Sequence, residues 1–287
     1  MRTRYRHAEH SASGAPGAMT VVGVHESSQR ARQTDGSIRG WVAMEEYAAI
    51  IENLTSLRVT RLPLADCTET DIVDRLCAVD ANVGIALVVG SNAAHSEAIA
   101  RRVDVRGGPT VVTEIDLATA AMAASVVSTL GQRGISPSRG RVIIACPERA
   151  PLLGPALIEC GVGSVTSWSN HDAQDFSLRR LISHNDVLVD LSDAENRIGD
   201  EMERTITIDS DPVPAASLAL PGLFDALSRR APTRVDASVL VACARALAVL
   251  SPRGKLLPDL DQPLLTTTVA RYAGRALDLV ERLQYSR

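Results

Sequence analysis

The chain has 287 residues, 45% of them hydrophobic, which is enough to bury one large core or two smaller ones, and this length favours two domains. The formal net charge of −4 argues against a nucleic-acid or anionic-membrane surface, because such a surface needs clustered positive charge. No stretch approaches the roughly 18 to 20 apolar residues of a membrane span, so neither nucleic acid nor membrane is an expected partner.

Composition also indicates how the chain begins and where it works. Residues 1–18, rich in Gly, Ala, Ser and Pro, are expected to form a disordered tail, and Met19 is an alternative start to Met1. Five cysteines without a CxxC pair indicate neither a disulfide framework nor a zinc site, so the expected compartment is the reducing cytoplasm. Lys255 is the only lysine.

Alternating strands and helices over residues 19–113 predict a small N-terminal α/β domain with a mostly parallel sheet. The strands are expected at 19–25, 57–64, 82–89 and 108–114. The helices between them are expected at 42–54, 68–79 and 92–103. Thr68 or Thr70 is the expected cap of the second of these helices.

Residues 114–287 are expected to form a second domain, which opens with a long helix over 117–134 capped by Asp116. Strands at 140–146, 163–169 and 185–192, with a helix at 152–161, predict a Rossmann-like, doubly wound parallel sheet. C-terminal helices are expected at 221–230, 235–250 and 264–284. The apolar surface of the second of these also favours a homodimer.

The turn after the 140–146 strand departs from a dinucleotide-binding fingerprint, whose three glycines allow a tight turn, approach of the pyrophosphate and close helix packing. The corresponding places hold Cys146, Glu148 and Pro151. Glu148 puts a negative side chain where phosphate would lie, and Pro151 removes an N–H group from the helix start. The turn therefore opposes pyrophosphate binding, and Pro155 moves the expected helix start towards itself.

Two residues keep NADP open as an alternative, although no cofactor is predicted. Arg149 can meet a phosphate as a point charge, but an arginine on an exposed turn is usually solvated. Ser169 ends the next strand, where an acidic residue would hold the ribose hydroxyl of NAD, and a serine there tolerates a 2′-phosphate.

Three residues are candidates for catalysis. Cys146 would lie beside a helix start and Arg149, a setting that activates thiols, but a cysteine at a strand end is commonly a small buried residue. Glu114 and Asp116 can face a cleft as an acid–base pair, while helix capping explains Asp116 without any function. No histidine spacing typical of a metal site is present, so no metal ligand is assigned.

Four blocks from about residue 19 onwards carry a family resemblance. They are "TETDIVDRLCAVDANVGIALVVG", "EIDLATAAM", "ALPGLFDALSRRAPTRVDASVLVACARALA" and "LLPDLDQPLLTTTVARYAGRAL". These blocks resemble, in order, the GINLEDI strand with its helix, the DDQHGTAxV junction, the PGIFRGAL-like helix with the helix after it, and the IIPSPFD ending of malic enzymes. The resemblance implies the two-domain fold of a decarboxylating oxidoreductase.

The residues that carry the chemistry of malic enzymes are replaced in this sequence. The resemblance puts the metal-binding Glu-Asp pair on Val88 and Val89 and the third carboxylate near Ile115, which leaves too few oxygen donors for a hard cation. It puts the catalytic lysine near Ala49 and reduces the substrate loop to about 208–217.

Malate decarboxylation is therefore not expected, because it needs a metal to polarise the carbonyl. For the catalytic tyrosine that the resemblance implies, Tyr5 and Tyr47 are poor substitutes. Three interpretations remain: a non-catalytic relative that binds a small molecule or a protein partner, a diverged metal-independent enzyme of a specialised biosynthetic pathway, and a weakly NADP-dependent oxidoreductase.

Overall fold

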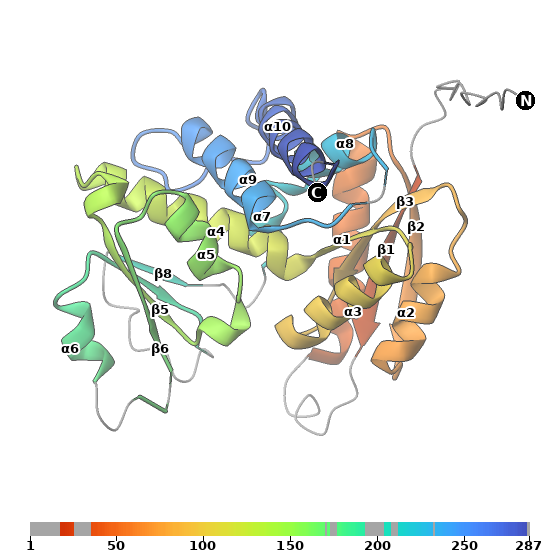
Figure 1. Cartoon of the computed structure of the whole chain (residues 1–287), viewed down its shortest axis with the longest axis horizontal. Coiled ribbons are helices and arrows are strands. Elements are labelled where there is room, and N and C mark those ends of the chain that lie inside the picture. The colour runs from red at the N-terminus through yellow and green to blue at the C-terminus, as the bar shows by residue number, and fades with distance from the viewer. Residues whose placement is uncertain are drawn as a thin grey trace, which may run out of the picture.

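The computed structural model describes residues 18–25, 36–169, 171–172, 177–192, 204–207, 212–231 and 233–285. Within these residues, two four-stranded parallel sheets are covered by helices, and α4 (Glu114–Gln132) lies between them (Figure 1). This arrangement confirms the α/β class and the Rossmann-like parallel sheet. In the same residues, no helix combines the length and the apolar character that a bilayer crossing requires.

The first sheet has the strand order β2-β1-β3-β4. Its strands are β1 (Ala18–His25), β2 (Arg58–Ala65), β3 (Val83–Val89) and β4 (Thr110–Thr113). One face packs on α1 (Gly36–Leu54), and the other packs on α2 (Glu69–Cys77) and α3 (Ala93–Val105). Both faces are therefore covered, which explains the continuous apolar run of β3.

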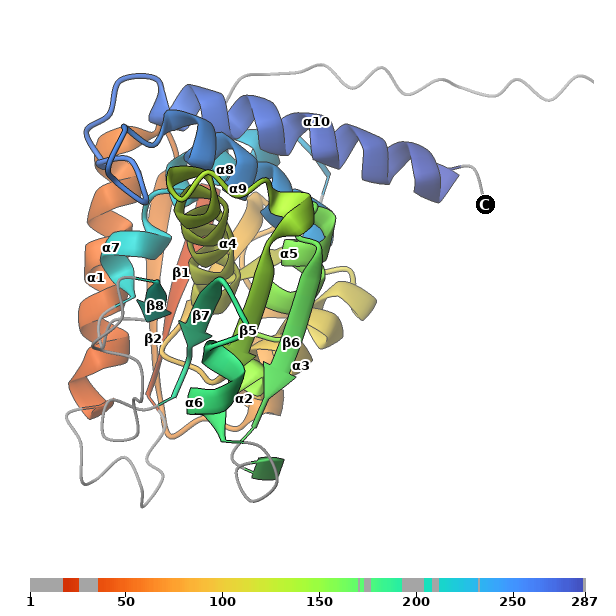
Figure 2. The same cartoon turned by 90° about the vertical axis from the view of Figure 1, so that its left-hand side faces the viewer.

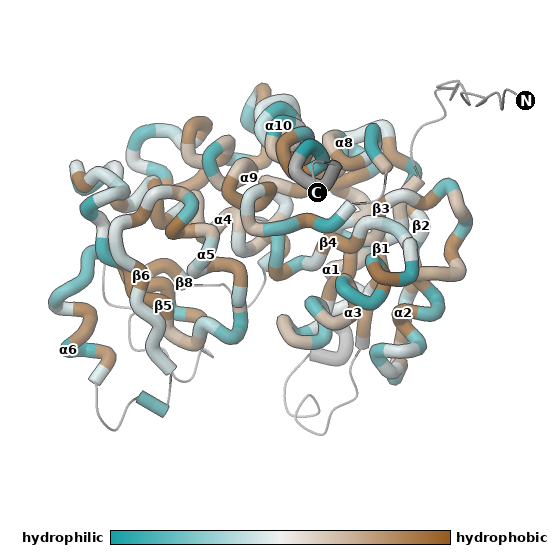
Figure 3. Tube along the Cα trace, viewed as in Figure 1, coloured by the Kyte–Doolittle hydropathy of each residue, from teal (hydrophilic) through white to brown (hydrophobic). Residues whose placement is uncertain are grey.

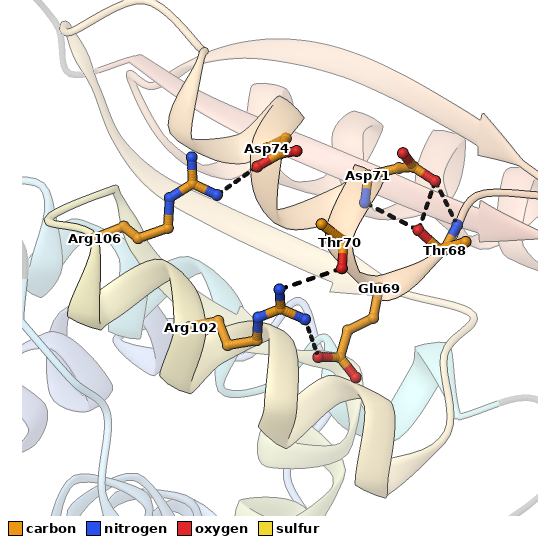
Figure 4. A network of polar contacts seen from close by, with 7 residues as sticks. All are labelled: Thr68, Glu69, Thr70, Asp71, Asp74, Arg102 and Arg106. Carbon is orange, nitrogen blue, oxygen red and sulfur yellow. Dashed lines mark hydrogen bonds and ion pairs between the residues drawn. The ribbon is translucent and has the colours of Figure 1, made fainter.

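The predicted N-terminal tail lies outside the described residues except for Ala18, which is the first residue of β1. Arg102 of α3 and Arg106, which directly follows this helix, pair with α2, as Figure 4 shows: Arg102 with Glu69, at 2.7 Å between Nη1 and Oε1, and Arg106 with Asp74. One of the two expected caps of α2 is also visible there. Thr68 caps α2 through reciprocal bonds with the acid at the third helical position.

The second sheet has the order β6-β5-β7-β8. Its strands are β5 (Arg141–Ala145), β6 (Ser164–Trp168), β7 (Val187–Asp190) and β8 (Thr205–Thr207). Helix α5 (Leu153–Glu159) follows β5, and α6 (Leu178–Ile182) precedes β7. Strand β8, α6 and α7 (Val213–Ala216) were not predicted, because segments of three to five residues are too short to show a periodicity.

Three helices begin at other residues than expected, and one of them is α1, which starts at Gly36 rather than at residue 42. Thr113, not Asp116, is the N-cap of α4, so the helix starts at Glu114 and Asp116 occupies the third position of a capping box. Helix α5 starts at Leu153 rather than near Pro155. A proline is tolerated at the third position, because the first four N–H groups of a helix have no partner within it.

The C-terminal helices form a layer across α4 (Figure 2). They are α8 (Leu220–Leu227), α9 (Ala237–Leu250) and α10 (Leu265–Tyr285), and the joint before α10 carries the exposed Lys255. Helix α9 packs against α4, α5 and α10. Most of the apolar surface that favoured a homodimer is therefore covered within the chain, while Val249 near the end of α9 is 68% exposed, and the homodimer stays a prediction.

The largest buried cluster extends across both sheets. It contains Leu87 of the first sheet, Leu117 of α4, Ile144 of the second sheet and Leu240 of α9. Hydrophobic residues occur along the strands of both sheets in Figure 3. Helix α4 thus lies inside a core that both halves of the molecule share, with twelve of its residues buried.

Candidate functional site

Two crevices are candidate sites because of the strand order. In both sheets the second strand lies on one side of the first and the third strand on the other, so the connections diverge between β1 and β3 and between β5 and β7. Open parallel sheets bind ligands outside the carboxyl ends of the strands at such a point. The residues at these two places decide which ligands can enter.

Backbone closes the first crevice at the carboxyl ends of β1 and β3. Gly90 has a positive φ of +77°, and a Cβ there would lie 2.6 Å from the Val24 oxygen and 2.8 Å from the Gly40 Cα. The first turns of α1 therefore approach these strand ends at backbone distance. Val88 and Val89 are 1% and 0% exposed, and they belong to different buried clusters on opposite faces of the sheet.

The predicted acid–base pair is divided between different partners. Tyr47, fully buried on α1, donates a hydrogen bond to Glu114 Oε1 at 3.1 Å. Asp116 Oδ2 instead accepts from the backbone N–H and the hydroxyl of Thr113, at 2.9 and 2.8 Å. Burial raises the pKa of the Asp116 carboxyl, although the Thr113 bonds and Arg234 act in the opposite direction. Sequence reasoning did not find the Tyr47–Glu114 contact, since no local pattern links these residues.

The positions that the resemblance assigns to the metal of malic enzymes do not fit a divalent cation. Val88 and Val89 offer only buried hydrocarbon, and Ile115 stands at the third position. Where the chain is described, no three His, Cys, Asp or Glu side chains are grouped so that they could hold a metal ion. The exposed Ala49 on α1 supplies no proton carrier in place of the lysine.

A side chain spans the second crevice. After β5, Cys146 adopts the left-handed conformation, with φ 56° and ψ 54°, and a 3-10 turn covers Pro147–Arg149. Arg149 Nη1 donates to the carbonyl oxygen of Leu191, just beyond β7, at 2.9 Å. Arg149 is exposed, as an arginine on a turn is expected to be, and its guanidinium also links the ends of the two strands. Cys146 is 5% exposed, as expected of a small buried residue.

Ser169 faces a carboxylate. Its backbone N–H and its hydroxyl donate to Asp172 Oδ2 at 2.8 and 2.9 Å, and these bonds lower the pKa of Asp172. A 2′-phosphate at Ser169 would meet this negative group. The turn also lacks a glycine at which backbone could approach a pyrophosphate. The residues of the second crevice therefore do not fit a dinucleotide.

Comparisons with known proteins show which folds this structure resembles. No family model matches the sequence, and no curated protein matches it significantly. Solved structures do match: a malic enzyme from Pyrococcus horikoshii superposes with a TM-score of 0.68 and 15% identity, covering 90% of this chain and 76% of its own. This chain has the malic enzyme fold. The fold predicted from the resemblance is thereby confirmed.

Two further malic enzymes share this fold. That of Entamoeba histolytica gives a TM-score of 0.69 at 12% identity and covers 90% of this chain and 69% of its own. The NAD-dependent malic enzyme of Thermotoga maritima gives 0.65 at 11% identity, covering 90% and 84%. At such low identity the malic enzyme likeness is one of fold alone.

Proposed function

We propose that this chain is a non-catalytic protein with the malic enzyme fold, which binds a small molecule or a protein partner. The burial of Val88 and Val89 in two separate apolar clusters carries the proposal. Without oxygen ligands there, no Lewis acid is held to polarise a carbonyl as carbon dioxide leaves, an effect worth several kcal/mol in metal-dependent enzymes. The loss therefore removes the term on which malate decarboxylation depends.

The second crevice supports the same proposal. Arg149 occupies the space between the ends of β5 and β7, and its guanidinium is bonded to Leu191. A dinucleotide would have to displace this contact and also lie beside Glu148 and the Asp172 carboxylate. Because the crevice has no glycine turn to offset these costs, hydride transfer to NAD or NADP is not expected.

The test combines turnover with binding. The full chain, incubated with malate, Mg²⁺ or Mn²⁺ and either NAD or NADP, is expected to give no increase in absorbance of the reduced nicotinamide. Thermal unfolding is expected to be unchanged by either dinucleotide, since a ligand at a hundredfold excess over its Kd would stabilise by about 2.7 kcal/mol. Metal-dependent turnover, or an NADP shift abolished by Arg149→Ala, would overturn the proposal and favour the oxidoreductase alternative.

One observation favours a second candidate, a diverged metal-independent enzyme. Cys146 is one of three non-glycine residues with positive φ among the described residues, and strained backbone of this kind is frequent at functional sites. Thiol labelling of the native chain at neutral pH tests this candidate. Cys243 is the control, because burial raises its pKa to about 12. If Cys146 reacts as slowly as Cys243, it is no nucleophile.

A further inference from the structure

A small cavity of about 70 Å³ lies at the edge of the first sheet. Helix α3, strand β4, the first turns of α4 and the segments 151–152 and 233–235 surround it. Val88, Val89, Cys146 and Ser169 are not among the residues that line it. Ile115 and Pro151 do line it, so the cavity adjoins one position that the resemblance assigns to the metal and one of the cofactor turn.

An unpaired hydroxyl group lines this cavity. Thr119 on α4 is 1% exposed, and its Oγ1 has no hydrogen-bond partner. On the same helix, Ser125 donates to the Ala121 carbonyl at 3.0 Å and Thr129 to the Ser125 carbonyl at 2.8 Å. The Ser128 hydroxyl is unpaired as well, but Ser128 does not line the cavity. Because an unpaired buried hydroxyl is costly, the Thr119 Oγ1 marks a place where a bound polar group would restore a hydrogen bond.

The charged residues at the cavity set the sign of that group. Three carboxylates, those of Glu97, Asp104 and Asp116, and one guanidinium, that of Arg234, line the cavity. Asp116 accepts both of its Thr113 bonds at Oδ2, so its Oδ1 keeps lone pairs for a further donor. A desolvated carboxylate next to an unpaired hydroxyl favours a cation that can donate several hydrogen bonds.

We propose that this cavity binds the ammonium group of a small aliphatic amine. The ammonium has three donors, and Asp116 Oδ1 and Thr119 Oγ1 accept two of them. The alkyl part contacts the apolar lining, which includes Val111 and Leu152. A cavity of about 150 Å³ holds benzene, so this one suits a head group of about three heavy atoms, with a longer chain leaving through its mouth.

The inference rests on the proposed binding function and names the class of its ligand. Its test measures binding of propylamine to the full chain by calorimetry at pH 7. Two probes of similar size serve as controls: propan-1-ol, which is uncharged, and propionate, which is an anion. Propylammonium is expected to bind with a Kd of about 1 mM, as suits four heavy atoms, and to bind at least about tenfold more tightly than either control. Equal affinity for the three probes would overturn the inference.

Variants locate the site. Thr119→Val removes the hydroxyl at nearly constant volume and is expected to weaken propylammonium binding about threefold to tenfold without loss of stability, because that hydroxyl has no partner. Asp116→Asn is expected to weaken it by about tenfold or more. Asp71→Asn is the matched control, since Asp71 makes the same capping contacts with Thr68 on the exposed surface of α2.

A fourth variant predicts the opposite change. Arg234→Gln removes the cation at the cavity and is expected to tighten binding about threefold. Unchanged affinity in both Asp116→Asn and Thr119→Val would place the amine elsewhere and overturn the inference. These results are independent of malate turnover and dinucleotide binding, on which the proposed function stands or falls.

Discussion

Asp116 is the residue at which burial and charge oppose each other most clearly. Burial raises the pKa of its carboxyl, as does Glu97 on α3, while Thr113 and Arg234 lower it. The pKa of Asp116 in the folded chain is thus above the unfolded value of about 3.9. At pH values between these two pKa values, the folded chain binds more protons than the unfolded chain. The stabilisation that protonated Asp116 gives the folded chain is complete below the pKa of the unfolded state. It is lost as the pH rises through the pKa of the folded state.

The first prediction follows from that sign. The free energy of unfolding of the wild type, minus that of Asp116→Asn, is expected to fall as the pH rises from about 4, and it can be measured by urea unfolding at a series of pH values. Asp71→Asn gives the opposite trend, because bonds from Thr68 lower the pKa of Asp71, whose contribution is lost as the pH falls. A pH-independent difference for Asp116→Asn would show that Asp116 titrates normally.

Whether the role of a residue could be predicted from the sequence depended on how far along the chain its interaction partner lies. The absence of oxygen ligands at Val88 and Val89 can be read directly from the sequence, since a valine side chain has no oxygen. The role of Asp116 was predicted approximately, because its partner Thr113 is three residues away. The Tyr47–Glu114 bond spans 67 residues, and only the fold brings its two ends together.

The contact between α1 and the strand ends depends on glycine. Gly40 and Gly90 lie so close that a side chain on either would meet backbone, with the nearest atom to a Cβ on Gly40 being the Val24 oxygen at 2.3 Å. Backbone cannot move aside as a flexible side chain can. The position of α1 against β1 and β3 is therefore fixed by the absence of two Cβ atoms.

The second prediction compares two glycines in the left-handed region. Gly90→Ala adds a steric clash to the backbone strain, so it is expected to lower the free energy of unfolding by more than about 2 kcal/mol. Gly107→Ala, with φ +67° and nothing within 4 Å of the new Cβ, is expected to cost only the strain of about 1–2 kcal/mol. Chemical denaturation of both variants gives the difference, and equal losses would contradict the close contact at Gly90.

Among the elements, length decided what the sequence could predict. The strands of the first sheet and the long helices α4, α9 and α10 were expected within a few residues of their bounds, because their apolar patterns extend over a whole strand or several helical turns. The start of α1 at Gly36 lies six residues before the expected one. Short elements such as β8 and α6 have no such signal. The start of α4 at Glu114 was missed by three residues, since both Thr113 and Asp116 could serve as its cap. Helix α5 starts at Leu153, before Pro155, because a proline is tolerated in the first turn of a helix.

At the scale of the whole molecule, the two sheets share one core. Leu87, Leu117 and Ile144 belong to the same buried cluster, and α4 supplies the central layer of it. Neither half can expose its side of α4 without exposing apolar surface of the other half. The two halves are therefore expected to unfold together.

The third prediction uses the two tryptophans, one in each half. Trp41 is on α1 and Trp168 at the end of β6, so Trp168→Phe leaves a fluorophore that reports on the first half, and Trp41→Phe one that reports on the second. For each variant, urea unfolding is followed by tryptophan fluorescence and by circular dichroism. After correction for any change in stability, the two fluorescence transitions are expected to have the same midpoint as the transition seen by circular dichroism. Two separate midpoints would mean that the shared cluster does not couple the sheets.

The burial of Val88 and Val89 on opposite faces of β3 also bears on how a metal site could be introduced here. A carboxylate at Val88 would place a charge in the cluster beneath α2 and α3, and one at Val89 would place a second charge in the core around α4. Each step taken alone costs several kcal/mol and yields no metal site in return. A metal site at these two positions therefore cannot be gained one residue at a time without a loss of stability at each step.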